Sequence, residues 1–303
     1  MPYPWASQYG CIARALWKSP EMGAAPGNRD LKLAGLIPWI MRNEPLPAGL
    51  KTRELVPIYE AATKNLWRSD ALIQTIGAVL YSSVAALGNA PAQPTSNAAL
   101  LDVGLAEWER TSAALPLIAL GAEGLLSSCL VQSWTTFETL VTDTWVAALN
   151  MHPRGLSNLT GGKVKTGKDD DRKSVSLALL QRYNYDLSNS MGSLLRSKYG
   201  FDSLNGVRTA YRDAFGDVKS IHDPLADPAL DALNAIRQVL VHRSGIADEE
   251  YVSKVANLPL APQVRIGDPL LLDGEVTAAL LFAGRSIALA FLTAVDEWLA
   301  ANP

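Results

Sequence analysis

Hydrophobic residues recur at helical spacing over long stretches of this chain, and this feature constrains its fold more than any other. In residues 117–149 the large apolar side chains lie three or four positions apart along one stripe. Similar periods run through residues 98–114, 229–242 and 274–300. No stretch alternates apolar and polar residues for long enough to build a sheet. We therefore expect an all-α fold, a bundle of long antiparallel helices.

The other segments predict shorter elements. We expect one helix from Thr52 and a second from Ser69, a residue suited to an N-cap, to residue 87. Asp227-Pro228 and Ser244-Gly245 mark the start and the end of the helix over 229–242. The remaining expectations are a helix over 174–198, a break over 200–207, a short helix over 208–215, turns over 216–228 and a small hairpin over 264–272.

The N-terminal part differs in composition from the rest of the chain. Its first fifty residues hold seven of the 18 prolines and three tryptophans, Trp5, Trp17 and Trp39. Proline disfavours regular structure, whereas large aromatic side chains are rare in a solvated tail. We expect an arm that packs on the body. A Pro- and Asn-containing linker near residues 89–97 predicts a division between a helical extension, 1–97, and the bundle, 98–303.

Composition excludes several classes of protein. Hydrophobic residues make up 48% of the 303, so a sizeable core can form. A net charge of −3 excludes a generally cationic nucleic-acid coat, although a local basic groove remains open. Two cysteines exclude a disulfide scaffold and a cysteine-rich zinc site, and a multi-histidine metal site would use most of the three histidines. We expect no metal, no cofactor and no membrane span. The start of the chain resembles no signal peptide, so we also expect a cytoplasmic location.

A polar, charged loop is expected over residues 154–173. Residues 162–168 have the GxxxxGK spacing of a phosphate-binding loop, but Asp169 stands where magnesium requires Ser or Thr, and a helix precedes where a strand is needed. A solvated loop is the simpler interpretation. The alternative is a basic lip that contacts nucleic-acid backbone through Lys163, Lys165 and Lys168.

Two residues with useful chemistry, Arg237 and His242, lie near the end of the helix over 229–242. Five helical residues place two side chains about 140° apart, so one helix does not bring both groups onto one ligand. Two copies around a dimer axis could do so. A structural role is also open, because the helix dipole favours basic residues near a C-terminus.

The wider pattern resembles the HEPN superfamily, a group of all-α domains rich in ribonucleases. Arg237 and His242 fit its R-x4-H signature, and Arg243-Ser-Gly-Ile-Ala-Asp is similar to the residues that come after the histidine in that family. The helix with Phe137-Glu138 resembles the first core helix of the family. The similarity covers about residues 117–300. Active members often carry Asn, Asp or His after the arginine, whereas this chain carries Gln238.

The resemblance implies a metal-independent endoribonuclease that leaves 2′,3′-cyclic phosphate and 5′-hydroxyl ends. His242 would act as general acid or base, Arg237 would stabilise the phosphorane, and Gln238 would orient the phosphate or the imidazole. Glu138 would position Arg237 or His242, unless it serves a structural ion pair. Arg243 would contact the RNA backbone.

The resemblance also implies partners: RNA, a second copy of the chain in a homodimer, and an antitoxin or defence-system protein. Such domains often act as toxins or as anti-phage effectors in bacteria. The alternative function is a catalytically silent helical module that binds a nucleotide or a protein and uses Arg237 and His242 to recognise phosphate.

Overall fold

The computed structural model describes residues 31–36, 49–86, 96–153 and 176–302. Within these ranges the chain forms helices and no strand, with one isolated antiparallel bridge between Ile246 and Pro269. The predicted all-α class is confirmed.

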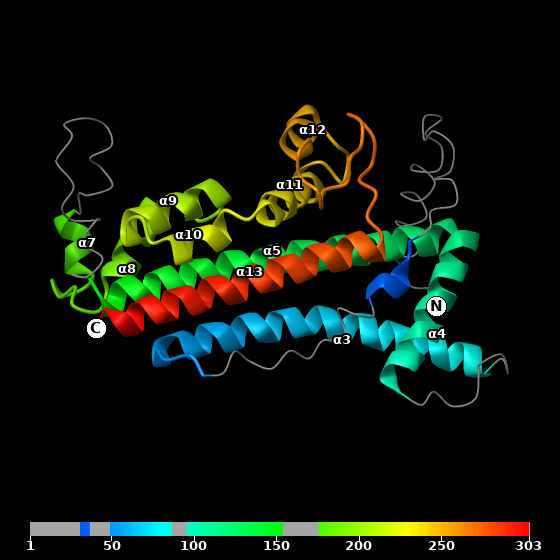
Figure 1. Cartoon of the computed structure of the whole chain (residues 1–303), viewed down its shortest axis with the longest axis horizontal. Coiled ribbons are helices and arrows are strands. Elements are labelled where there is room, and N and C mark those ends of the chain that lie inside the picture. Colours follow the sequence, from blue (N-terminus) through cyan, green and yellow to red (C-terminus); the bar gives the residue numbers. More distant parts are fainter. Residues whose placement is uncertain (1–30, 37–48, 87–95, 154–175, 303) are drawn as a thin grey trace, which may run out of the picture.

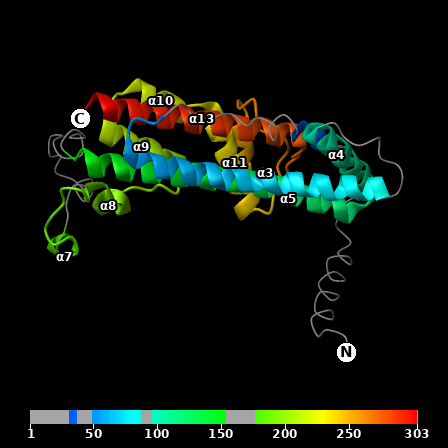
Figure 2. The same cartoon turned by 90° about the horizontal axis from the view of Figure 1, so that it is seen from below.

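Three long helices run along the length of the molecule (Figures 1 and 2). They are α3 (Val56–Ala86), α5 (Pro116–Met151) and α13 (Gly274–Ala301). The helices α3 and α5 run in opposite directions, as expected, whereas α5 and α13 run in the same direction (Figure 1). The large aromatic side chains predicted to form a stripe on α5, including Trp134 and Trp145, are buried among these helices.

A layer of shorter helices covers the side of α5 and α13 that faces away from α3 (Figure 1). It consists of α8 (Met191–Leu195), α9 (Leu204–Phe215), α10 (Lys219–Leu225), α11 (Pro228–His242) and α12 (Glu249–Val255). Two buried hydrogen bonds attach α9 to α5. Trp145 Nε1 donates to the carbonyl of Ala210 at 3.0 Å, and Tyr211 Oη donates to the carbonyl of Val141 at 2.6 Å. This layer carries the candidate site.

Helix α4 (Asn97–Ala114) crosses α3 at a pair of glycines. A Cβ atom added at Gly104 would lie 2.1 Å from the carbonyl oxygen of Gly77, so the two backbones approach each other too closely for any side chain. The Oγ of Ser96 accepts a hydrogen bond from the amide of Ala99 and caps the helix, which therefore begins close to the predicted residue 98.

Several predicted boundaries are wrong. Ser69 does not begin a helix, because α3 continues through it, and its buried hydroxyl donates to Gln132 Oε1 on α5 at 2.7 Å. The predicted helix over 174–198 is broken into α7 (Leu177–Gln181), α8 and the 3₁₀ turn η4 (Arg196–Lys198). Asn184 and Tyr185 interrupt it with left-handed φ values of 51° and 60°.

The segments around α11 also differ from expectation. The break near residue 200 is shorter than predicted, since α9 begins at Leu204. The predicted turns contain α10, which buries Ile221 and Leu225. Residues 264–272 form no hairpin of their own. They pair instead with the residues that come after α11. The amide of Ala247 donates to the backbone carbonyl of Asp268, and the amide of Leu270 donates to the backbone carbonyl of Gly245.

The described part of the N-terminal extension packs on the bundle. Leu33, Leu36 and Leu55 are fully buried in the same core as α5 and α13. The backbone amides of Lys51 and Thr52 donate to the Asp296 carboxylate at 2.8 and 2.7 Å. The three tryptophans of the predicted arm and most of the predicted linker lie outside the described residues, so a division near residue 97 stays a prediction.

Helix α13 is long and apolar enough to cross a membrane by length and composition alone, with a mean hydropathy of 1.9 over its most apolar window. Half of that window is buried inside the protein, and core helices of soluble proteins meet the same criteria of length and hydropathy.

Candidate functional site

The helix that carries Arg237 and His242 has the limits that its flanking residues predict. The Oδ1 of Asp227 accepts from the amide of Ala229 at 2.8 Å, and Pro228 occupies the first helical turn. Ser244 and Gly245 take left-handed φ values of 53° and 81° beyond the last turn, and the amide of Gly245 donates to the carbonyl of Val239. These local signals end α11 at His242, and His242, Arg243 and Ser244 are exposed.

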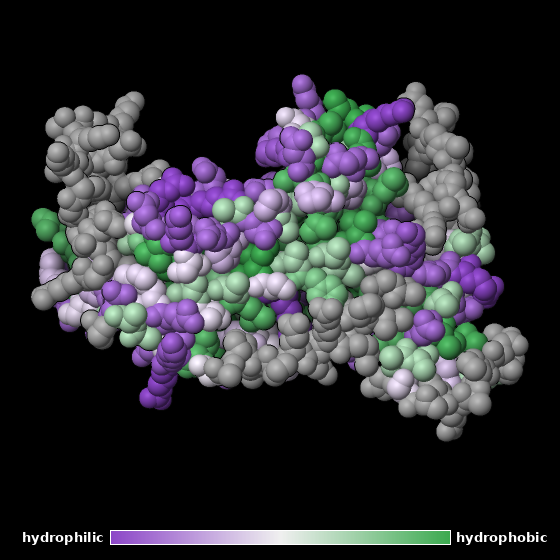
Figure 3. All heavy atoms as spheres, viewed as in Figure 1, coloured by the Kyte–Doolittle hydropathy of each residue, from purple (hydrophilic) through white to green (hydrophobic). Residues whose placement is uncertain are grey.

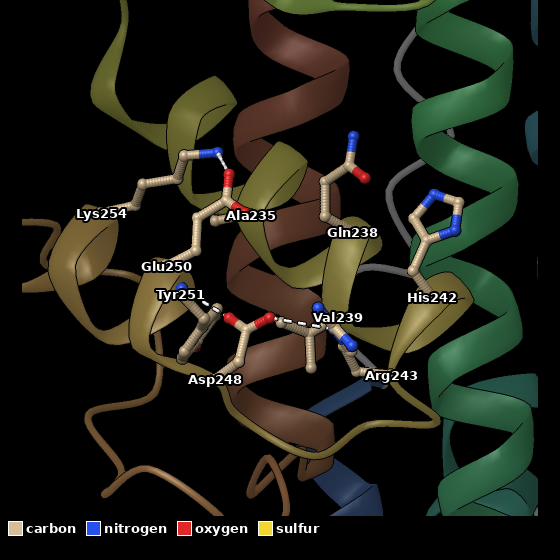
Figure 4. Close-up of a pocket in the computed structure, with 9 residues that line it drawn as sticks. All are labelled: Ala235, Gln238, Val239, His242, Arg243, Asp248, Glu250, Tyr251 and Lys254. Atoms are coloured by element: carbon tan, nitrogen blue, oxygen red, sulfur yellow. Dashed lines mark hydrogen bonds and ion pairs between the residues drawn. The ribbon is translucent and has the colours of Figure 1, made fainter.

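One face of α11 lines a pocket of about 340 Å³ that α12 closes on its other side (Figure 4). Ala235, Gln238, Val239 and His242 follow the i, i+3, i+4, i+7 spacing of a single helix face, and all four line this pocket. His242 is exposed and Gln238 is half-buried. The structure therefore brings together two of the predicted catalytic residues, Gln238 and His242.

Arg237 does not line this pocket, because it lies on a different face of α11, directed to α5. Its charge acts on the half-buried carboxyl of Glu138. Burial raises the pKa of Glu138, the positive charge of Arg237 pulls it back down, and the negative charge of Asp202 raises it further. Glu138 therefore interacts electrostatically with Arg237, and it does not line the pocket of His242.

The guanidinium of Arg237 has an unsatisfied buried donor within the described part of the chain. The side chain as a whole is half-buried, but its Nε is buried and has no hydrogen-bond partner among the described residues. On the same face, one turn earlier, the buried Oδ1 of Asn234 also lacks a partner within the described part of the chain. Unpaired buried polar atoms are costly, and they often mark a place where a ligand or a structural change completes the bonding.

Arg243 reaches the pocket of His242 and is held there by an aspartate. Its Nε donates to Asp248 Oδ2 at 3.1 Å, while Asp248 Oδ1 accepts from the amide of Tyr251 at 2.9 Å and caps α12. The backbone hydrogen bond from Tyr251, followed by the hydrogen bond and charge of Arg243, lowers the pKa of Asp248. Arg243 is 63% exposed in its side chain, so the pair leaves much of the side chain accessible to solvent.

Helix α12 supplies the far wall of the pocket. Lys254 Nζ pairs with Glu250 Oε1 at 2.6 Å. The ring of Tyr251 is buried and its hydroxyl donates to the carbonyl of Pro262 at 2.9 Å. The sequence did not predict a role for Asp248, Glu250, Tyr251 or Lys254 at this site. Two local signals could have found them. Asp is a favoured N-cap residue, and from Asp248 its carboxylate can accept from the amide of Tyr251, three positions later. Glu250 and Lys254 have the i, i+4 spacing of a helical ion pair.

A second, larger pocket of about 640 Å³ lies on the other side of the α11 terminus. The first half of α5, the end of α11 and residues 269–272 line it, and its lining is mostly apolar. Exposed hydrophobic side chains occur around it: Leu120, Val241, Ile246 and Leu271. Figure 3 shows hydrophobic residues gathered over α11, α12 and the segment that leads to α13.

The predicted basic lip, Lys163, Lys165 and Lys168, lies outside the described residues. Within the ranges that the structure describes, no three His, Cys, Asp or Glu side chains are placed to hold a metal ion. Comparison of the chain with protein-family models, with curated proteins and with solved structures found no match.

Proposed function

We propose that this protein is a metal-independent endoribonuclease of the HEPN type. The observation that carries the proposal is the end of α11. There an exposed His242 lines an open polar pocket, and Arg237, with a buried Nε that has no partner within the described residues, lies five positions earlier. Histidine moves protons near neutral pH, and a guanidinium stabilises negative charge on phosphate oxygens.

The chemistry requires these side chains, the RNA and water. The 2′-oxygen of one nucleotide forms a bond to the adjacent phosphorus and loses its proton to a base. The bond from phosphorus to the 5′-oxygen breaks, and that oxygen receives a proton. The products are a 2′,3′-cyclic phosphate and a 5′-hydroxyl. His242 accepts the proton of the 2′-hydroxyl, water supplies the proton that the 5′-oxygen receives, and Arg237 stabilises the charge on the non-bridging oxygens.

We propose that the protein acts as a homodimer, because Arg237 and His242 face different surroundings within one chain. A second copy that packs against the α11 terminus would bring its own His242 towards Arg237. The exposed apolar side chains of Val241 and Ile246 beside this terminus are suited to such a contact, since burial of apolar surface drives association.

The remaining partners rest on the resemblance of the sequence. The chain carries 27 basic and 30 acidic residues, and this balance suits a nuclease with a selected RNA target better than strong non-specific binding. We propose a cytoplasmic toxin or anti-phage effector, restrained by an antitoxin or by a partner from a defence system.

The competing candidate is a catalytically silent module that binds a nucleotide or a protein. The separation of Arg237 from the pocket of His242 favours it, because a single chain then has a binding pocket without its charge-stabilising group.

One assay decides between the two. Purified full-length protein is incubated with RNA in EDTA, and the product ends are analysed. Cyclic phosphate ends support the endoribonuclease. Intact RNA under these conditions, or cleavage that needs added magnesium, contradicts it.

A further inference from the structure

The charged groups around the pocket of His242 are all paired with one another. Arg243 pairs with Asp248 at 3.1 Å and Lys254 pairs with Glu250 at 2.6 Å (Figure 4). Each positive charge therefore already has an acidic partner in the pocket wall. A phosphate would compete with these carboxylates for the cations, whereas an uncharged polar group would not. The pocket therefore favours an uncharged polar group.

The other polar groups of the pocket are available to such a ligand. Gln238 and His242 line the pocket, and neither side chain has a hydrogen-bond partner among the residues that the structure describes. The amide of glutamine offers both donors and an acceptor, which can read the edge of a nucleobase. The floor is apolar: Ala235 and Val239 are buried there, together with the ring of Tyr251.

The arrangement of Arg243 fits a stacking surface. Asp248 holds Arg243 through Nε alone, and Asp248 is itself fixed because its second oxygen caps α12. The guanidinium plane is thus oriented while its side chain stays 63% exposed. Single-stranded RNA is recognised by bases that stack on aromatic rings or on guanidinium planes and that form hydrogen bonds along their edges.

We propose that the pocket between α11 and α12 is a subsite for one nucleobase of the RNA, next to the scissile phosphate. The base stacks on the guanidinium of Arg243, which Asp248 positions, and Gln238 forms hydrogen bonds with its edge. This inference rests on the proposed endoribonuclease function and deepens it. It changes the expected role of Arg243 from a backbone contact to a base contact, and that of Gln238 from a catalytic group to a residue that selects the base.

The test measures binding apart from cleavage. Full-length protein is titrated by calorimetry with dinucleotides whose 2′-O-methyl groups prevent cleavage, one for each base, with a matched abasic compound and with inorganic phosphate. Loss of the base should weaken binding by about tenfold or more, since one stacked base contributes that much. The preferred base should bind about tenfold more tightly than the least preferred one.

Three variants assign the roles, and melting curves confirm that each is folded. Gln238→Glu keeps the shape but removes the amide donors, so it should change the preferred base. Gln238→Leu should remove the preference while the stacked base still binds. Arg243→Lys keeps the charge and removes the plane, so it should weaken binding of every base by about tenfold.

The inference is overturned if the abasic compound or inorganic phosphate binds as tightly as the base-containing dinucleotides, or if Arg243→Lys leaves binding unchanged. Failure of the proposed function is a separate result. If the wild-type protein binds bases selectively but never cleaves RNA, the nuclease proposal is wrong and the subsite proposal is supported. If it cleaves RNA but binds all bases and the abasic compound equally, the nuclease proposal is supported and the subsite proposal is wrong.

Discussion

Arg237 and His242 belong to the same helix but face different parts of the molecule. Arg237 acts on the half-buried carboxyl of Glu138 on α5, whereas His242 lines the pocket that α11 shares with α12. The separation is a result of helical geometry, because five residues turn a side chain through about 140° beyond a full turn. A site that uses both groups needs either a second chain or a substrate that spans two faces of α11.

Replacement of His242 by alanine should reduce RNA cleavage by at least about a hundredfold, because a general acid or base is lost. The side chain is exposed, so the fold should not change. Cleavage in EDTA and helical circular dichroism check the two statements. His152→Ala, at the far end of α5, is the matched control and should retain cleavage. Equal losses of activity and helicity in His242→Ala would identify a structural histidine.

Mixing two inactive variants should restore part of the activity. Arg237→Ala protein keeps His242, and His242→Ala protein keeps Arg237, so a mixed dimer holds one complete composite site. The measurement is RNA cleavage after the two proteins are unfolded and refolded together, compared with each alone. Light scattering should show a dimer.

Two results would contradict this prediction. Mixed dimers that form but cleave nothing would place each site within one chain. A monomer that cleaves RNA at the concentrations of the assay would remove the need for a partner copy.

Glu138→Gln should increase the free energy of unfolding at pH 7 by up to about 1 kcal/mol. Burial raises the pKa of Glu138, so at pH values between the unfolded and the folded pKa the folded chain binds a proton that the unfolded chain has released. The stability that depends on this proton is present at low pH and is lost as pH rises through the folded pKa. The difference between variant and wild type should therefore disappear near pH 3, where both states are protonated.

Denaturant unfolding at several pH values measures this difference. Glu60→Gln, at an exposed position of α3, is the control and should show little change. A variant Glu138→Gln that is less stable than wild type at pH 7 would show that the attraction between Glu138 and Arg237 outweighs the cost of burial.

Gly104→Ala should destabilise the protein by about 1–3 kcal/mol, because the new Cβ would lie 2.1 Å from the carbonyl oxygen of Gly77 and would push α4 away from α3. Gly121→Ala, in α5, is the matched control. Its Cβ would meet nothing within 4 Å, and alanine favours a helix interior, so stability should rise by up to about 1 kcal/mol. Thermal melting measures both. Equal melting temperatures for the two variants would contradict the close crossing of α3 and α4.

Prediction from the sequence succeeded where the signal was local. The limits of α11 are set by Asp227-Pro228 and Ser244-Gly245, because capping hydrogen bonds and left-handed residues act within a few positions of each other. The divergence of Arg237 and His242 is a consequence of the helical period alone. The sequence determined by itself the all-α class, the helices α4, α5, α11 and α13, and the face of α11 on which each side chain lies.

Only the tertiary structure decided the rest. Ser69 resembles an N-cap, but its hydroxyl donates to Gln132 on α5, and α3 continues past this residue without a break. The expected hairpin over 264–272 pairs with residues 245–247 instead. The pocket of His242 exists because α12 folds back against α11, and the burial that raises the pKa of Glu138 exists because α11 packs on α5. Such contacts join residues far apart in the chain, and their free energies depend on which surfaces meet, which no local pattern encodes.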